Sequence, residues 1–122
     1  MQIGIVAERT ELSIRTLRHY EEVGLVIPSA RTSGGFRLYT EHDVVRLRTI
    51  RRMKPLGFTL EEMRQLLSSL ETLADPEADP AAQRAAADFV AGCHTRAEES
   101  CAALEKQLAY AEEFKDQLAA HL

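Results

Sequence analysis

Four arginines are spaced so that they could bind a polyanion. Arg15 and Arg18 lie three residues apart, a spacing that places both side chains on one face of a helix. Arg31 and Arg37 flank a Ser-Gly-Gly sequence that is typical of a tight turn between two short strands. A basic helix beside a basic hairpin has the chemistry of a winged helix-turn-helix, in which the helix enters a groove of duplex DNA and the hairpin contacts phosphates. The sequence therefore favours DNA as the ligand.

Local signals predict the elements that must position these arginines. We expect a first helix from Ile3 to about Arg9, and Ser13 is a favourable N-cap for a second helix, the recognition helix, which carries two of the arginines. Gly24 would end this helix, and Pro28 prevents it from restarting. The glycine pair at 34–35 permits the turn of the hairpin. The predicted arrangement is therefore a helix-turn-helix followed by a hairpin wing.

Two capping boxes predict the helices that follow the hairpin. Thr40 with Asp43 opens the first, which ends near Pro55, and Thr59 with Glu62 opens the second. Apolar residues recur along one side of each helix, as expected for elements that pack on a core. The outer surface near the end of the first helix carries three basic side chains: Arg51, Arg52 and Lys54.

The last part of the chain is predicted to be one long helix with an apolar stripe. The stripe comprises residues 90, 93, 97, 101, 104, 108, 111, 114, 118 and 122, which is nine steps over 32 positions, or 3.56 residues per step. This period lies between the ~3.6 of a helix and the ~3.5 of a heptad repeat, and an identical helix is the natural cover for it. The sequence thus predicts a DNA-binding domain over residues 1–70, a linker over 71–80 and a dimerisation helix over 81–122.

The charge divides along the same boundary. Residues 1–70 carry 11 Lys and Arg against 8 Asp and Glu, a net charge of +3, whereas residues 71–122 carry 4 against 11, a net charge of −7. The basic charge belongs to the part with the arginine motif, and the acidic part should face away from phosphate. No apolar run approaches the roughly 20 residues of a membrane span, and no signal segment opens the sequence, so we expect a cytoplasmic protein.

Four motifs resemble those of the MerR family of bacterial transcription regulators. They read S-I-R-T-L-R-H-Y-E at 13–21, G-L at 24–25, R-T-S-G-G-F-R-L-Y at 31–39 and L-G-F-T-L-E-E at 56–62. The resemblance implies a mainly α fold, with a winged helix-turn-helix, a small β-hairpin wing and a long dimerisation helix that pairs antiparallel with its twin. It also implies a homodimer that distorts double-stranded promoter DNA so that RNA polymerase can engage it. Glu11 departs from the family pattern, which often has glycine or asparagine at this position.

The resemblance also implies DNA contacts on the recognition helix. It assigns Arg18 and Tyr20 to the phosphate backbone, and Arg15 and Thr16 to the base edges. Tyr20 follows Leu17 by three positions, so packing in the core is the alternative for its ring. A phenol can do both, because it can bury its ring and still donate its hydroxyl to a phosphate.

Side chains of the hairpin should alternate between two faces. Phe36 and Leu38 would then pack on the protein, while Arg37 and Tyr39 meet the duplex. Arg31 is expected to contact a phosphate or the minor groove, as is Arg37.

The basic residues 51, 52 and 54 resemble a second set of DNA contacts in the family, and a solvated basic surface is the alternative interpretation. A broader alternative is a coiled-coil interaction protein, in which the long helix recruits a partner and the basic face is incidental. The motifs identify neither the target promoter nor any small-molecule or metal effector.

Cys93 and Cys101 are the remaining candidates for chemistry. Both fall on the apolar stripe, where a free cysteine packs as a small hydrophobic residue. Eight residues apart on one helix, their Cα atoms would be separated by about 12 Å, too far for a disulfide. The alternative is a metal or thiol-redox sensor, although these two cysteines with His94 match no zinc-site spacing. We expect packing, with no metal or other cofactor.

Nothing in the sequence supports catalysis. It contains no Ser-His-Asp constellation, metal-binding histidine pair or glycine-rich phosphate loop, and its four histidines fall on unrelated elements. We therefore expect a protein that is not an enzyme.

Overall fold

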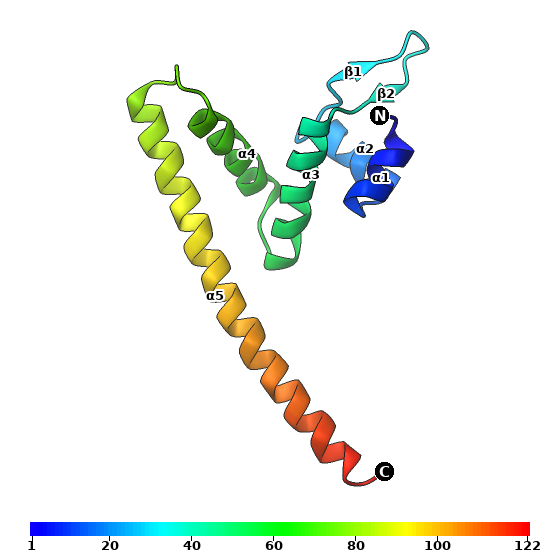
Figure 1. Ribbon diagram of the computed structural model, residues 1–122, viewed down its shortest axis with the longest axis vertical. Helices are drawn as coiled ribbons and strands as arrows, with labels where there is room; N and C mark the ends of the chain where they lie inside the picture. The colour runs from blue at the N-terminus through cyan, green and yellow to red at the C-terminus, as the bar shows by residue number, and fades with distance from the viewer.

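The computed structural model describes all 122 residues as five α-helices, a short 3-10 turn and one two-stranded hairpin (Figure 1). In chain order the elements are α1 (Ile3–Thr10), α2 (Ile14–Glu22), β1 (Ala30–Arg31), β2 (Arg37–Leu38), α3 (Glu41–Met53), the 3-10 turn η1 (Lys54–Leu56), α4 (Leu60–Ala74) and α5 (Pro80–Ala119). The hairpin is antiparallel, with Ala30 opposite Leu38 and Arg31 opposite Arg37. The predicted order of helices, wing and long C-terminal helix is confirmed.

The predicted helix starts are confirmed by their caps. The Ser13 hydroxyl accepts a hydrogen bond from the Thr16 N–H at 3.0 Å and so begins α2. Both capping boxes are present at the starts of α3 and α4. The turn between α1 and α2 places Glu11 at φ 58, in the left-handed region. Glycine and asparagine adopt this conformation more readily than glutamate does.

One hydrophobic core joins α1, α2, α3 and α4. It consists of Val6, Leu17, Tyr20, Leu25, Val26, Tyr39, Val44, Leu47, Ile50, Met53, Phe58, Met63 and Leu67. Leu17 and Leu47 are no more than 1% exposed, and burying such a side chain stabilises the fold by about 1.5–3 kcal/mol. Because Leu17 points into this core, Arg15 and Arg18 on the same helix point outwards.

The wing does not follow the alternation expected from its sequence. Phe36, which was expected to pack, is 68% exposed, whereas Tyr39, expected to face outwards with Arg37, is only 2% exposed. Tyr39 lies beyond the end of β2, and its N–H donates to the Met1 carbonyl at 2.7 Å, so its ring enters the core. A strand of two residues is too short to impose its alternation on the residues that flank it.

Helix α5 packs along α4 over its first half only, and the second half extends away from the rest of the chain (Figure 1). Cys93 lies against the core. Arg96 donates to Glu62 at 2.6 Å and lies over the Phe58 ring at 3.8 Å, which ties α5 to the start of α4. Every residue from Cys101 onward is exposed, so the second half of the apolar stripe is uncovered in a single chain.

The segment between α4 and α5 is shorter than expected. Residues 71–74 continue α4 instead of starting a linker, because neither proline nor glycine occurs there before Pro76. Residues 75–79 then make the connection, and the Asp79 carboxylate caps α5 by accepting from the Ala82 N–H at 3.3 Å. None of the helices is both long enough and apolar enough to cross a membrane.

Candidate nucleic-acid interface

The outer face of α2 carries two arginines that have no acidic partner in the chain. Arg15 and Arg18 are exposed, and neither forms a salt bridge. The helix is held from behind by Leu17 and at its start by the Ser13 cap, so the backbone that carries both arginines is fixed. Two free guanidinium groups on one helix face suit phosphate oxygens or the edge of a guanine.

Lys54 joins this face from the turn after α3. Together with Arg15, Thr16 and Tyr20, it lines a surface cavity of about 380 Å³. The Tyr20 side chain is 3% exposed and belongs to the core, and this burial raises the pKa of its hydroxyl. The hydroxyl therefore stays protonated and can donate a hydrogen bond. The tertiary structure thus gathers three basic or polar side chains of α2 and one lysine from η1 around one depression.

The wing arginines are joined by an acidic residue that the sequence did not single out. Glu21, in the last turn of α2, accepts hydrogen bonds from Arg31 and from Arg37. Its side chain is 15% exposed, and the Glu21 carboxylate raises the pKa of Arg37. Glu21 precedes its two partners by 10 and 16 residues. No local pattern reveals such a contact, because it depends on how the hairpin folds back on the helix.

Three of the candidate contacts lie elsewhere. Arg51 pairs with Glu11, which follows α1, and Arg52 lines an apolar groove between α3 and α5. The Tyr39 hydroxyl is buried and has no hydrogen-bond partner. The expectation that Tyr39 meets the duplex is therefore wrong, because its ring is part of the core.

The cysteines occupy two different environments. Cys93 lines the apolar groove between α3 and α5, of about 310 Å³, whereas Cys101 is exposed. Burial, together with the nearby Glu62 carboxylate, raises the pKa of the Cys93 thiol. A neutral thiol is a poor metal ligand and nucleophile. No three His, Cys, Asp or Glu side chains lie close enough together in this chain to hold a metal ion.

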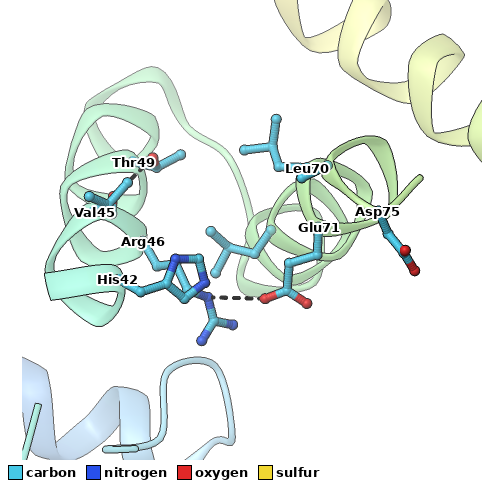
Figure 2. A pocket seen from close by; sticks show the side chains of 9 residues that line it. His42, Val45, Arg46, Thr49, Leu70, Glu71 and Asp75 are labelled. Atoms are coloured by element: carbon cyan, nitrogen blue, oxygen red, sulfur yellow. Dashed lines mark hydrogen bonds and ion pairs between the residues drawn. The ribbon is translucent and has the colours of Figure 1, made fainter. Parts of the chain in front are cut away.

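A second groove separates α3 from α4, and Figure 2 shows its lining. His42, Val45 and Arg46 from α3 face Leu70 and Glu71 from α4 across a volume of about 270 Å³. The Arg46 Nε lies 3.5 Å from the Glu71 carboxylate, which is the one ion pair that spans the groove. None of the candidate DNA contacts lines it, so this groove is separate from the basic face.

Comparison with known families agrees with this geometry. Residues 1–70 match the family described as MerR HTH family regulatory protein, and residues 44–121 match the family described as MerR, DNA binding. The chain is a member of the MerR family. The resemblance drawn from the four sequence motifs is thus confirmed, as is the winged helix-turn-helix fold.

Known relatives of this MerR-family chain include a nodulation protein and a transcriptional regulator. It is 43% identical over 74 residues to the nodulation protein NolA of Bradyrhizobium elkanii, which covers 61% of this chain and 34% of NolA. It is 48% identical over 67 residues to the HTH-type transcriptional regulator ZntR of Escherichia coli strain K12, which covers 55% of this chain and 48% of ZntR. This chain therefore spans between a third and a half of the length of these two proteins.

The fold is also similar to that of MtaN, the N-terminus of the multidrug transporter activator of Bacillus subtilis. The two structures align with a TM-score of 0.50 at 35% sequence identity, over 88% of this chain and 97% of MtaN. The similarity extends beyond the part of the chain that the sequence motifs cover, and so includes much of α5.

Proposed function

We propose that this protein is a homodimeric transcription regulator that binds promoter DNA through the outer face of α2 and the wing. The observation that carries the proposal is the pair of unpartnered guanidinium groups of Arg15 and Arg18 on α2, of which Arg15 shares a depression with Lys54. A cationic surface that is not neutralised within the chain releases counterions when it meets phosphates, which is the main source of affinity for DNA. Binding to chromosomal promoters implies a cytoplasmic protein.

Within this interface, Arg18 and the Tyr20 hydroxyl contact phosphates, while Arg15 and Thr16 reach the base edges of the major groove. Arg15 and Thr16 lie in the first turn of α2, the part of a recognition helix that meets the bases. Lys54 adds a phosphate contact from beside the same depression.

In the wing, Arg37 contacts the flanking phosphates or the minor groove, and Arg31 lies beside it on the paired strand. Arg51 and Arg52 belong to a second, weaker set of contacts, because Arg51 is already paired with Glu11 and Arg52 lies towards α5. Tyr39 is not among the proposed DNA contacts, because its hydroxyl is buried.

The uncovered half of the α5 stripe supports the homodimer. Leu104, Leu108, Phe114 and Leu118 are 48–59% exposed, and a single chain offers nothing to cover them. An identical α5 packed antiparallel buries this stripe and relates two recognition helices by a two-fold axis. The dimer then reads a palindromic site in two major grooves, and it bends and untwists the promoter between them so that RNA polymerase can engage it. In this organisation residues 1–70 bind DNA and residues 81–122 form the dimer.

The proposal is tested by the salt dependence of binding to a duplex that contains the operator. Arg18→Ala should weaken binding to all duplexes and flatten the slope of log K against log salt by about one unit, as expected for one lost phosphate contact. Arg84→Ala is the matched control, since Arg84 is an exposed arginine on α5 that forms no salt bridge.

An unchanged slope, or an equal effect of both substitutions, would contradict the assignment of Arg18. If the unaltered protein binds duplex DNA weakly and without dependence on salt, the interaction-protein alternative is favoured instead.

A further inference from the structure

We infer that Glu21 is a positioning residue that holds the wing in a fixed orientation beside the recognition helix. Its Oε1 accepts from Arg31 Nη2 and its Oε2 from Arg37 Nε, so a single carboxylate holds both strands of the hairpin. Glu21 itself is anchored in α2 between the core residue Tyr20 and the end of the helix. The role in DNA reading rests on the proposed function, whereas the tether itself is a property of the fold.

The wing needs this tether because it has little else to orient it. Each strand has two residues, and an isolated hairpin of this size is at most marginally stable. Bonds to Asp43 and to Met1 anchor the wing at Ser29 and Tyr39, just outside the strands. Between these anchors, no other hydrogen bond or ion pair joins residues 30–38 to a helix.

The two wing arginines differ in how many of their nitrogen atoms already donate hydrogen bonds within the chain. Arg31 donates a hydrogen bond from Nη2 to Glu21 and another from Nη1 to the Gly35 carbonyl at 3.0 Å. Both terminal nitrogens of its guanidinium group therefore already have partners in the chain. Arg37 donates to Glu21 from Nε only, which leaves its Nη1 and Nη2 without partners in the chain. Arg37 is therefore the wing's phosphate contact, and Glu21 reduces the combined charge of the two arginines from +2 to +1.

The tether is tested without DNA by limited proteolysis with trypsin, which cleaves after arginine. Glu21→Gln keeps the shape of the side chain but removes its charge, and it should speed cleavage after Arg31 and Arg37 by about threefold to tenfold, the range expected for two partly exposed ion pairs. Glu22→Gln is the matched control, because Glu22 is exposed, lies one position further along α2 and forms no salt bridge. Its wing should be cleaved at the unaltered rate.

The same variants test the role in DNA reading. Both glutamine variants remove one negative charge near the duplex, so both should bind unrelated DNA more tightly and with a steeper salt slope. Only Glu21→Gln should also lower the ratio of operator affinity to unrelated-DNA affinity, by about tenfold, because a wing that is no longer held in place cannot fix the register and orientation of the recognition helix on the operator. Glu21→Asp keeps the negative charge but shortens the side chain, so that it no longer reaches both arginines. This variant should lose specificity while retaining the salt slope of the unaltered protein.

Equal trypsin cleavage of the two glutamine variants would overturn the tether. Faster cleavage of Glu21→Gln with an unchanged affinity ratio would overturn the role in DNA reading. If the unaltered protein itself shows no salt-dependent binding to duplexes, the proposed function fails, and the trypsin comparison still decides whether Glu21 holds the wing. Thermal unfolding of each variant shows whether a change in cleavage comes from the wing or from the whole fold.

Discussion

Replacing Asp43, the one charged residue that is buried, by alanine should destabilise the fold strongly. Asp43 is 1% exposed in the first turn of α3. Its carboxylate accepts from the Ser29 N–H at 3.2 Å, from the Ser29 hydroxyl at 2.8 Å and from the Thr40 N–H at 2.9 Å. One side chain thus caps α3 and fixes the segment that leads into the wing.

The magnitude follows from the partners that Asp43→Ala leaves behind. A hydrogen bond to a charged acceptor contributes about 1.5–3 kcal/mol, and loss of a helix cap costs about 1 kcal/mol. Ser29 and Thr40 are themselves exposed, so water can replace part of what their N–H groups lose. We therefore expect the free energy of unfolding to fall by about 3 kcal/mol, a large share of the 5–15 kcal/mol typical of a small protein.

Urea denaturation followed by circular dichroism measures this change. All variants should be compared at one protein concentration, because the stability of a dimer depends on concentration. Ser29→Ala removes only the hydroxyl partner and should cost about 1 kcal/mol. The double variant should cost less than the sum of the two single ones, since the residues contact each other. A cost below 1 kcal/mol for Asp43→Ala, or strict additivity, would refute this account of the buried carboxylate.

Three further predictions concern α5 and its contact with α4. Removing residues 101–122 should leave a folded monomer that binds a full operator weakly, measured by sedimentation and titration; undiminished affinity would exclude the dimer coil from the mechanism. Cys93→Ala should lower the free energy of unfolding by about 1 kcal/mol, and Cys101→Ala should lower it much less in the monomer. The double variant should retain operator binding and the transcriptional response, and loss of that response alone would identify the cysteines as a sensor. The Thr59 N–H lowers the pKa of Glu62, so the ionised Glu62 carboxylate stabilises the fold above its unfolded pKa of about 4.3. This stabilisation is lost as the pH falls through the folded pKa, so the stability of Glu62→Gln, measured as a function of pH, should fall less in acid than that of the unaltered protein.

Sequence alone determined the features that depend on neighbouring residues. Ser13, Thr40 and Thr59 were identified as caps because each bonds to a residue three positions away, a distance that the helix geometry sets. The outward direction of Arg15 and Arg18 followed in the same way from their spacing relative to Leu17. The family was also recognisable, since its motifs are short segments whose order and separation can be read along the chain.

Only the tertiary structure decided which distant segments meet. Tyr39 turned into the core because its backbone pairs with Met1, and the wing arginines came together on Glu21 because the hairpin folds over the end of α2. The two halves of the stripe on α5 look alike in sequence, yet one is covered by α4 and the other by nothing in the same chain. Such contacts depend on the packing of whole elements, whose free energy is summed over many residues and leaves no periodic or local pattern.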